Sequence, residues 1–455
     1  MNTKTKSVDM LHGTLWDKIL LFALPVAATA VLEQLFNASD IAVVGSFAAL
    51  KRTESVAAIG AVSPVIGLIL NLFIGISLGS NVIISTALGK GDKITTSKTV
   101  HTSIVTALLA GILVAAIGEL SISQILKIIM IPADVYPLAL LYMRIYFLGL
   151  PVILLYNFEA AIFRSIGKTN IPLFALASSG ILNVILNLFF VIKLHMSVNG
   201  VAVATVLSNT ISATLLFYLL CNTDLEIKIR SENLKIDFSV LKNILKIGLP
   251  AGIQSAVFAF ANIVIQSAIN SLGTVVMAAS SAAYNIEIIA YYVMNSFSQA
   301  CTTFTGHNYG AGNLKRCRKV LMLSLIEGVI ALAISVIIIL TFGKSLISLF
   351  NNEPDVISIG YIRLMIIMAG YTFSLIYEIL SGYLRGFGIS LIPALLTMIG
   401  VCGIRIAWVQ FVFPYHRTFP IIMAAYPLSL STTAILILLA VIHYRPSKCF
   451  NKNMN

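Results

Sequence analysis

Long apolar runs, separated by short polar breaks, recur along the whole chain. A run of more than about 18 apolar residues is long enough to cross the hydrocarbon core of a membrane as a helix. The pattern predicts twelve such helices, at residues 18–45, 56–87, 99–121, 137–163, 172–192, 199–220, 247–270, 275–306, 320–342, 357–383, 390–413 and 419–443. We therefore expect an all-α integral membrane protein that crosses the lipid bilayer twelve times.

Landmarks of the first half of the chain return in the second half in the same order and at a nearly constant offset. Arg144 is matched by Arg363, and Pro25 is matched by Pro250. The other pairs are Gly89-Lys90-Gly91-Asp92 with Gly310-Ala311-Gly312-Asn313, and Arg164-Ser165-Ile166-Gly167 with Arg385-Gly386-Phe387-Gly388. Each half has an even number of crossings, so both halves share one orientation, which predicts a parallel repeat of two pseudosymmetric six-helix lobes.

The longest polar interruption, Asn222 to Lys246, lies near the midpoint of the chain. It predicts an N-lobe at 1–221 with helices 1 to 6 and a cytoplasmic linker at 222–246. A C-lobe at 247–455 then holds helices 7 to 12 and a cytoplasmic tail. Two such lobes with polar groups buried inside them are a common plan for transport by alternating access.

Charge is scarce and unevenly placed. Only 11% of the 455 residues are charged, against about 25% in soluble proteins. The net charge of +12 would suggest nucleic-acid binding in a soluble protein. Here the positive-inside rule explains it, because one set of alternate loops is poor in basic residues. That set holds Lys51, Arg52, Lys127, Lys193, Lys344 and Arg417. We expect both termini in the cytoplasm, the cell membrane as the location, and no nucleic-acid partner.

Two acids, Glu33 and Asp40, lie inside the first predicted helix. They are two helical turns apart, so they face the same way. Charged residues inside a bilayer are costly and usually serve a function. An acid withdrawn from water favours its neutral form, so Asp40 could exchange a proton near neutral pH. A structural role for Asp40, as a cap or as a partner of a neighbouring helix, is the alternative.

Later spans contain three more acids, Glu159, Glu287 and Glu378. Arg405 is the one strong cation in mid-span, and Glu378 is the partner we expect first for it, in a buried ion pair. Glu159 could pair with Arg164 or Lys168 instead of serving a cargo. There is no Walker motif, so we expect neither ATP nor any other cofactor, only a coupling ion.

Several fragments together carry a family resemblance. They are LPVAATAVLEQLFNASDIAVVG at 24–45, FRSIGKTNIPL at 163–173, GLPAGI at 248–253, NSFSQACTTFTGHNYGAGN at 295–313 and YLRGFGISLIP at 383–393. In order and spacing they resemble the MATE (multidrug and toxic compound extrusion) family over nearly the whole chain. Phe258 stands where the NorM-like branch has an acid, so the chain is nearer the DinF-like and MepA-like branches.

The resemblance implies an H⁺- or Na⁺-coupled antiporter that exports organic, mostly cationic amphipathic compounds through a central cavity. We expect it to act as a monomer. Asp40 matches the family's acid on helix 1, and the resemblance implies Asn183, Asn187 and Thr205 as its partners in ion coupling. All four offer oxygen atoms, which suit a metal ion such as Na⁺ or a hydrogen-bonded protonated acid. The family often has Asp at the position of Asn187, and one carboxylate fewer leaves the coupling ion open.

Six further residues are candidates for a cavity that attracts cationic cargo. They are Glu33, Asn157, Glu159, Glu287, Glu378 and Arg405. A flippase for lipid-linked saccharides, which shares the superfamily fold, would favour a cavity rich in Arg and Lys. The acids outnumber the mid-span cation, so cationic cargo is preferred. A membrane-integral transferase enzyme is the distant alternative, because the six histidines are scattered and form no catalytic cluster.

Overall fold

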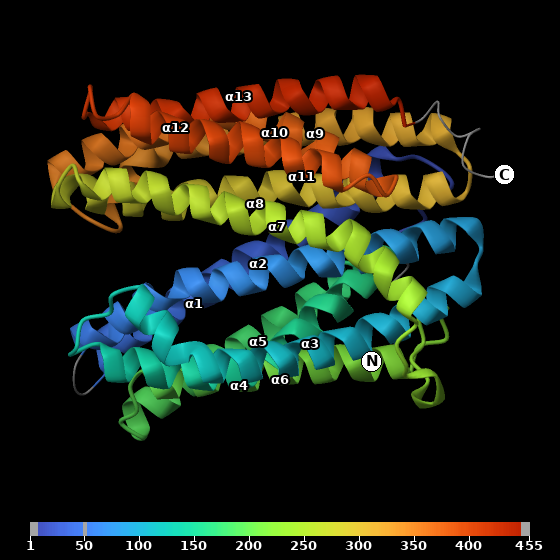
Figure 1. The fold of residues 1–455 in the computed structure, drawn as a ribbon, viewed down its shortest axis with the longest axis horizontal. Helices are drawn as coiled ribbons and strands as arrows, with labels where there is room; N and C mark the ends of the chain where they lie inside the picture. The colour runs from blue at the N-terminus through green and yellow to red at the C-terminus, as the bar shows by residue number, and fades with distance from the viewer. Residues whose placement is uncertain (1–7, 49–51, 447–455) are drawn as a thin grey trace. The chain divides into compact units, whose positions relative to one another are not determined.

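The computed structural model describes residues 8–48 and 52–446, and their regular structure is entirely helical (Figure 1). The α-helices are α1 (Trp16–Phe47), α2 (Arg52–Lys90), α3 (Lys93–Ile128), α4 (Tyr136–Ser165), α5 (Asn170–Leu188), α6 (Val198–Cys221), α7 (Phe238–Asn270), α8 (Thr274–Gly310), α9 (Leu314–Ser348), α10 (Pro354–Gly386), α11 (Leu391–Thr397), α12 (Ile404–Phe411) and α13 (Phe419–Tyr444). Two π-helical segments, η1 (Phe189–Lys193) and η3 (Met398–Gly403), and one 3₁₀ turn, η2 (Ser231–Asn233), complete the set.

Each predicted span corresponds to a helix, with α11, η3 and α12 together forming the span predicted at 390–413. Among the described residues, eleven helical segments are long and apolar enough to cross a membrane. The twelfth predicted span is α8, whose second half carries many Ser, Thr and Asn side chains that lower its mean hydropathy. The predicted all-α, twelve-helix membrane fold is confirmed.

Some helices continue beyond their apolar runs. α7 begins at Phe238, inside the stretch predicted as a linker, and not at residue 247. Val240, Ile244 and Ile247 are buried there, while Lys242 is exposed. This spacing places the apolar residues on one face of an amphipathic helix. The apolar run predicted at 247–270 does not include this amphipathic start of α7, because polar residues interrupt the apolar ones there.

The chain divides into two compact units that differ from its two sequence halves. Within the described residues, the first unit comprises Ala28–Ala87 and Asp92–Gly248. The second unit comprises Val8–Ala27, Leu88–Gly91 and the chain from Leu249 onward. The lobe boundaries predicted from the sequence describe the repeat and not these units, and they stay a prediction.

The first helix of each half is therefore shared between the units. α1 belongs to the second unit up to Ala27 and to the first unit from Ala28. α7 belongs to the first unit up to Gly248 and to the second unit from Leu249. The two changes fall next to Pro25 and Pro250, which are the paired prolines of the repeat.

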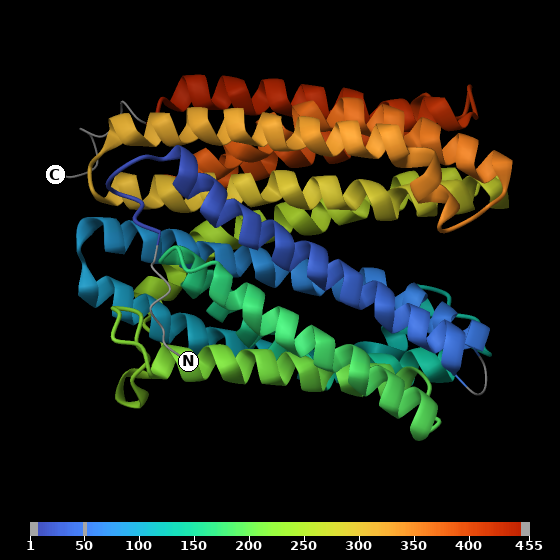
Figure 2. The ribbon, with the colours of Figure 1, turned by 180° about the vertical axis from the view of Figure 1, so that it is seen from behind.

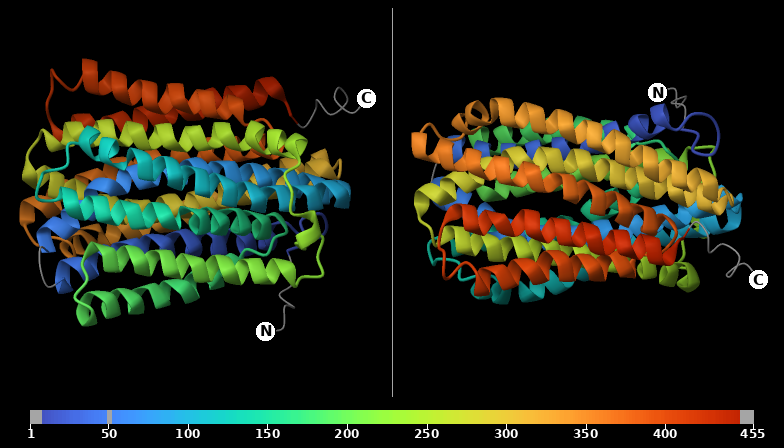
Figure 3. Two further views of the ribbon diagram at one scale, coloured as in Figure 1. Left: turned by 60° about the horizontal axis from the view of Figure 1, so that its bottom comes forward. Right: turned by 90° about the horizontal axis from the view of Figure 1, so that it is seen from above.

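In the first unit α4 packs along both α3 and α6, and α5 packs along α6 (Figure 3). Polar contacts attach α2 to this group. Ser103 Oγ of α3 donates a hydrogen bond to Ser80 Oγ at 2.8 Å, and Asn81 Nδ2 donates to the carbonyl oxygen of Ala161 on α4 at 3.2 Å. Hydrogen bonds of this kind hold transmembrane helices together where no hydrophobic effect drives them to associate.

In the second unit α10 packs along α8, α9 and α13 (Figures 1 and 2). The first part of α1 joins the same apolar core through Ile19, Phe22 and Ala23. The ring of Phe22 meets the edge of Phe304 on α8, with the ring centroids 5.8 Å apart.

The segment between α6 and α7 is attached to the start of α3 by polar contacts. The carboxylate of Asp237 lies 3.0 Å from Lys98 Nζ, and the backbone N–H of Arg230 donates to His101 Nε2 at 2.9 Å. The hydrogen bond from Lys98 holds the pKa of Asp237 below its usual range. This segment is therefore an ordered part of the first unit.

The repeated glycine-rich loops are tight turns between helices. Gly91 and Gly312 both have φ of 72°, a conformation that glycine adopts without strain. The next residues, Asp92 and Asn313, are the N-caps of α3 and α9, and their side chains accept hydrogen bonds from backbone N–H groups three residues on. Both copies of the repeat thus use the same turn and cap.

The cap of α3 gives a test of this assignment. Asp92→Ala removes the acceptor for the N–H and the hydroxyl of Thr95. We expect it to cost about 1 kcal/mol and to lower the midpoint of thermal unfolding in detergent by about 2 °C. Asp134→Ala is the control, because this exposed carboxylate has no hydrogen bond among the described residues. Equal midpoints for the two variants would contradict the capping role.

Candidate functional site

Asp40 lies at the centre of a buried polar network in the first unit. Its side chain is 5% exposed. Oδ1 accepts a hydrogen bond from Asn187 Nδ2 at 2.6 Å, and Oδ2 accepts one from Thr205 Oγ1 at 2.9 Å. Asn187 Nδ2 also donates to Asn183 Oδ1 at 3.0 Å. The four residues predicted for ion coupling therefore meet, from α1, α5 and α6.

The described residues of this network include no basic side chain, so its hydrogen bonds suit more than one protonation state. Thr205 Oγ1 lies 2.9 Å from Asp40 Oδ2 and 2.9 Å from the carbonyl oxygen of Val201. A hydroxyl has one proton to donate. When Asp40 is ionised, that proton goes to the carboxylate. When Asp40 is protonated, its own O–H can donate to Thr205, whose proton then goes to Val201.

One oxygen in the network has no partner. Asn187 is fully buried, and its Oδ1 accepts no hydrogen bond from the described residues. With the Asp40 carboxylate, Asn183 Oδ1 and Thr205 Oγ1, it could complete an oxygen set for a hard cation. The described residues contain no group of three or more His, Cys, Asp or Glu that could hold a metal ion. A cation here would rely on one carboxylate.

Local backbone features position this network. Gly180 provides the surface on which Phe36, one turn before Asp40, packs. A Cβ atom at Gly180 would lie 1.8 Å from Phe36 Cε2, so α1 can approach α5 only over a glycine. Asn187 lies in the last turn of α5, directly before the π-helical segment η1. Such segments are frequent at functional sites.

Glu33 and Asn157 differ in their surroundings. Glu33 is exposed, that is, not covered by the chain itself. Arg164 interacts with it electrostatically, but the two form no ion pair among the described residues. Asn157 is half-buried, and its Nδ2 donates to the carbonyl oxygen of Ile153 in its own helix at 2.9 Å. Of the five membrane acids predicted from the sequence, Glu33 is the accessible one.

Glu159 is fully buried on α4. Neither of its carboxylate oxygens has a hydrogen-bond partner in the described residues. The predicted ion pairs with Arg164 or Lys168 are not formed. Its place in a substrate cavity stays a prediction.

Glu287 on α8 is already neutralised by a partner. Arg363 on α10 donates from Nε to Glu287 Oε2 at 2.9 Å and from Nη2 to Oε1 at 2.6 Å. Its Nη1 donates to Ser280 Oγ at 2.7 Å, and both charged side chains are buried. A two-pronged pair of this kind leaves little free charge for a cargo, so a cargo role for Glu287, which stays a prediction, is disfavoured.

The predicted pair of Glu378 with Arg405 is not formed. Arg405 is fully buried and donates to Asn262 Oδ1 at 2.6 Å and to Ser429 Oγ at 3.2 Å. Its guanidinium lies 4.2 Å from the ring centroid of Tyr426. Glu378 is buried on α10 and interacts electrostatically with Arg385. Arg405 is also not the only buried arginine, since Arg363 and Arg385 are buried as well.

Two buried charged residues are absent from the predicted site. Arg363 enters the prediction only as a landmark of the repeat, although a basic residue inside a span indicates a buried partner. Glu327 lies inside the span predicted at 320–342, where a buried acid indicates a function in the same way. It is buried on α9, and neither carboxylate oxygen has a partner among the described residues.

Many apolar helices, a repeated half and a buried acid with neutral partners together define a membrane transporter. A family model described as MatE matches residues 25–189 and 250–409, one stretch in each half of the chain. This chain belongs to the MatE family, which is a family of transporters and not of enzymes.

Named relatives match over most of their length. The "Probable multidrug resistance protein YoeA" of Bacillus subtilis is 26% identical over 439 residues, covering 93% of this chain and 93% of that protein. YpnP, with the same description and from the same organism, is 28% identical over 403 residues, covering 88% and 89%.

Solved structures share the fold. One is described as the outward-facing conformation of a multidrug resistance MATE family transporter of the MOP superfamily. It has a TM-score of 0.88 and 22% identity, covering 98% of this chain and 100% of that one. A second, from Pyrococcus furiosus, gives the same values, and its description proposes a binding pocket of reverse polarity and a different function.

The close packing of Phe36 on Gly180 can be tested by a substitution that changes no charge. We expect Gly180→Ala to push α1 away from α5 and to reduce transport by at least about tenfold, because small misplacements at a site are costly. The control is Gly67→Ala on α2, where an added Cβ meets nothing within 4 Å. Transport by purified protein in vesicles measures the effect. Full activity of Gly180→Ala would rule out the close approach.

The Glu287–Arg363 pair predicts a specific pattern of stabilities. Arg363→Met leaves a buried acid without its partner, which costs about 3–5 kcal/mol in comparable cases. The double variant Glu287→Gln with Arg363→Met removes both charges and should recover most of that loss. Thermal unfolding in detergent compares the wild type, Arg363→Met, Glu287→Gln and the double variant. A double variant as unstable as the sum of the two single changes would contradict the pairing.

Proposed function

We propose that this chain is a multidrug efflux antiporter that exchanges H⁺ or Na⁺ for organic compounds, mainly cationic and amphipathic ones. It would work by alternating access, as other two-lobed transporters do. The observation that supports this most directly is the Asp40 network. Among the described residues, Asn187 and Thr205 donate to this buried acid and Asn183 accepts from Asn187, so Asp40 can gain and lose charge without breaking an ion pair.

The two coupling ions make different use of the same atoms. A proton would bind Asp40 itself and use the alternative hydrogen bonds of Thr205. Na⁺ would need the amide oxygens to turn toward it, including the unpartnered Oδ1 of Asn187. The amide nitrogen of Asn187 faces Asp40, as expected for a hydrogen-bonded carboxyl group. With one carboxylate in the set, the proton is the better-supported ion.

The preference for cationic cargo rests on Glu33. It is accessible, lies two helical turns from Asp40 and forms no ion pair among the described residues. The names of the relatives YoeA and YpnP support drug-like cargo. Glu287 adds little to this argument, because Arg363 neutralises it. The acid count from the sequence therefore overstates the negative charge available to a cargo.

A flippase for lipid-linked saccharides stays the alternative within the same fold. It would need accessible basic groups to bind a pyrophosphate. Arg405 and Arg363 are buried and bonded to groups of the second unit, which argues against this alternative. The fold alone does not decide, because one similar structure is described as having a pocket of reverse polarity.

The location follows from the positive-inside rule. We propose that the protein lies in the cell membrane as a monomer with both termini in the cytoplasm. The basic residues on the proposed cytoplasmic side include Lys93, Lys98, Lys315 and Arg316. The prediction of this orientation also rests on basic residues that lie outside the described part of the chain, namely Lys4, Lys6, Lys51, Lys448 and Lys452.

Flux measurements with separate gradients test the proposal. In vesicles containing the purified protein, an imposed H⁺ or Na⁺ gradient should drive a fluorescent organic cation in the direction opposite to the flow of the ion. We expect Asp40→Asn to reduce this flux to the level of protein-free vesicles, because the amide cannot bind a proton or supply a charge. Asp224→Asn, in the exposed segment after α6, is the matched control.

The outcomes separate the alternatives. Flux driven by only one gradient identifies the coupling ion. Wild-type flux by Asp40→Asn would exclude Asp40 as the coupling site. Absence of gradient-driven flux for any organic cation would favour the flippase.

A further inference from the structure

Glu327 is an acid of the second unit that the coupling network does not use. It lies well inside α9, which begins at Leu314, about 20 Å along the axis from that end. Its side chain is 2% exposed. Neither carboxylate oxygen has a hydrogen-bond partner among the described residues. An ionised carboxylate in such a place costs several kcal/mol, so a bound proton is favoured.

The groups around Glu327 are mostly neutral. Ser324 lies one turn before it on the same face of α9, is fully buried, and its hydroxyl also lacks a partner in the described residues. The thiol of Cys301 on α8 lies close to Ser324. On the α10 side, Leu375 and Ile379 contact the neighbouring Gly328. Asp17, in the first turn of α1, interacts electrostatically with Glu327.

The repeat indicates that the fold does not require an acid at this position. Glu327 corresponds to Thr106 of α3, because the offset between these two positions equals the offset between Arg164 and Arg385. The first unit thus places a neutral threonine where the second unit places a glutamate. A residue that only filled space between helices could be neutral in both copies. The acid is specific to the second unit and needs another explanation.

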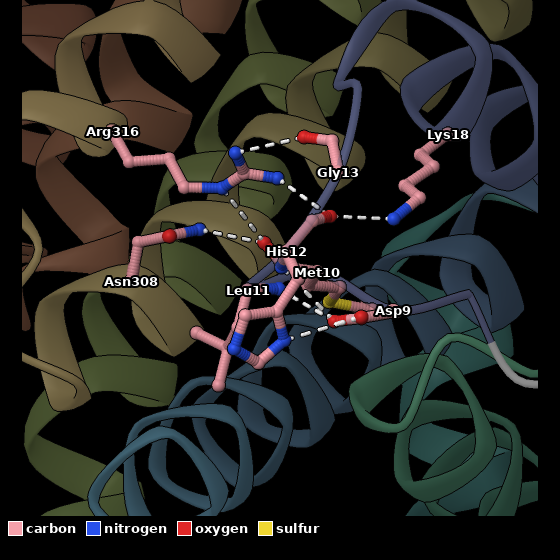
Figure 4. Close-up of polar contacts among 8 residues, drawn as sticks. All are labelled: Asp9, Met10, Leu11, His12, Gly13, Lys18, Asn308 and Arg316. Atoms are coloured by element: carbon pink, nitrogen blue, oxygen red, sulfur yellow. Dashed lines mark hydrogen bonds and ion pairs between the residues drawn. The ribbon is translucent and has the colours of Figure 1, made fainter.

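The segment before α1 is clamped over the start of α9 (Figure 4). The guanidinium of Arg316 donates to the carbonyl oxygens of Met10 at 3.3 Å, His12 at 3.0 Å and Gly13 at 3.0 Å. Asn308 Nδ2 of α8 also donates to the carbonyl oxygen of Met10, at 3.1 Å. Met10 and Leu15 are buried in the same apolar core as Cys317 and Val320 of α9. The clamped segment therefore covers apolar residues at the start of α9.

We propose that Glu327 is a proton-binding site of the second unit, separate from Asp40, and that the clamped segment keeps it from cytoplasmic water. The site rests on the proposed function in one respect, because a second bound proton matters to a transporter only if transport is coupled to ions. Proton exchange at Glu327 requires water to reach it. Release of residues 10–15 from Arg316 and Asn308 would open that route.

Infrared spectroscopy of the purified protein tests the site without any transport. A protonated carboxylic acid has a C=O stretching band that an ionised carboxylate lacks. We expect one such band to be lost in Glu327→Gln and retained in Asp40→Asn and in Glu119→Gln, an acid that pairs with Arg144 on the first unit. Glu327→Asp keeps a carboxyl group but changes its position on α9, which should shift the band, so it serves if Glu327→Gln does not fold. Unchanged bands in both variants would overturn the proposal.

Chemical labelling tests the clamp. A water-soluble carbodiimide should label Glu327 slowly in the wild type and several-fold faster in Arg316→Gln, as measured by peptide mass spectrometry. Lys315→Gln removes the same charge from an exposed neighbour and should leave the rate unchanged. Equal rates in the wild type and Arg316→Gln would overturn the shielding role. Neither experiment depends on flux, so a failure here and a failure of the coupling at Asp40 are distinguishable.

Discussion

A polar group inside a hydrocarbon layer has no water to solvate it, so the protein must supply every partner. Three buried side chains of this chain meet that requirement in different ways. Glu287 is matched by Arg363 with two short hydrogen bonds. Arg405 is held by Asn262 and Ser429, with an aromatic ring beside its guanidinium. Within the described part of the chain, Asp40 accepts hydrogen bonds from one amide and one hydroxyl and from no charged group. Charge is fixed where the partner is charged, and it can change where the partners are neutral. That difference separates the Glu287–Arg363 ion pair from a buried acid whose charge can change.

Asp40 lies on α1, a helix that belongs partly to each of the two units. Up to Ala27, α1 belongs to the second unit, and from Ala28 to the first. The clamp by Arg316 holds the segment before the helix within the second unit, and Asp40 is bound within the first unit. One continuous helix thus carries the Asp40 network toward one end and an anchor at the other. Pro25 lies next to the change between units, about 22 Å from Asp40 in a straight helix. The proline is therefore relevant to where the helix changes unit, and not to the chemistry of the acid.

Much of this arrangement can be predicted from the sequence, because hydrophobic length and the repeat determine where helices lie. The Asp40 network was also predictable, since Asn183 and Asn187 are one turn apart on α5 and a resemblance supplied their partner. The pairing of Glu378 with Arg405 was wrong, and the pairing of Glu287 with Arg363 was missed. Periodicity gives the face of a helix on which a residue lies but not the rotation of that helix against its neighbours. The packing of Phe36 on Gly180 could not be predicted for the same reason. The sequence does not show which glycine of one helix is covered by a ring of the neighbouring helix.

The two copies of the repeat agree in backbone and differ in chemistry. Both have a glycine turn with φ of 72° followed by an N-cap, at Gly91 with Asp92 and at Gly312 with Asn313. Such features maintain the fold, and a duplicated fold needs them twice. Asp40 and Glu327 show no such symmetry: at the offset that relates Pro25 to Pro250, Asp40 corresponds to Ile265, and at the offset that relates Arg164 to Arg385, Glu327 corresponds to Thr106. Glu287 also occurs in one copy only, but Arg363 neutralises it. Asp40 and Glu327 have no basic partner among the described residues, so an ion pair does not offset their cost, and a function is the reason we infer for it.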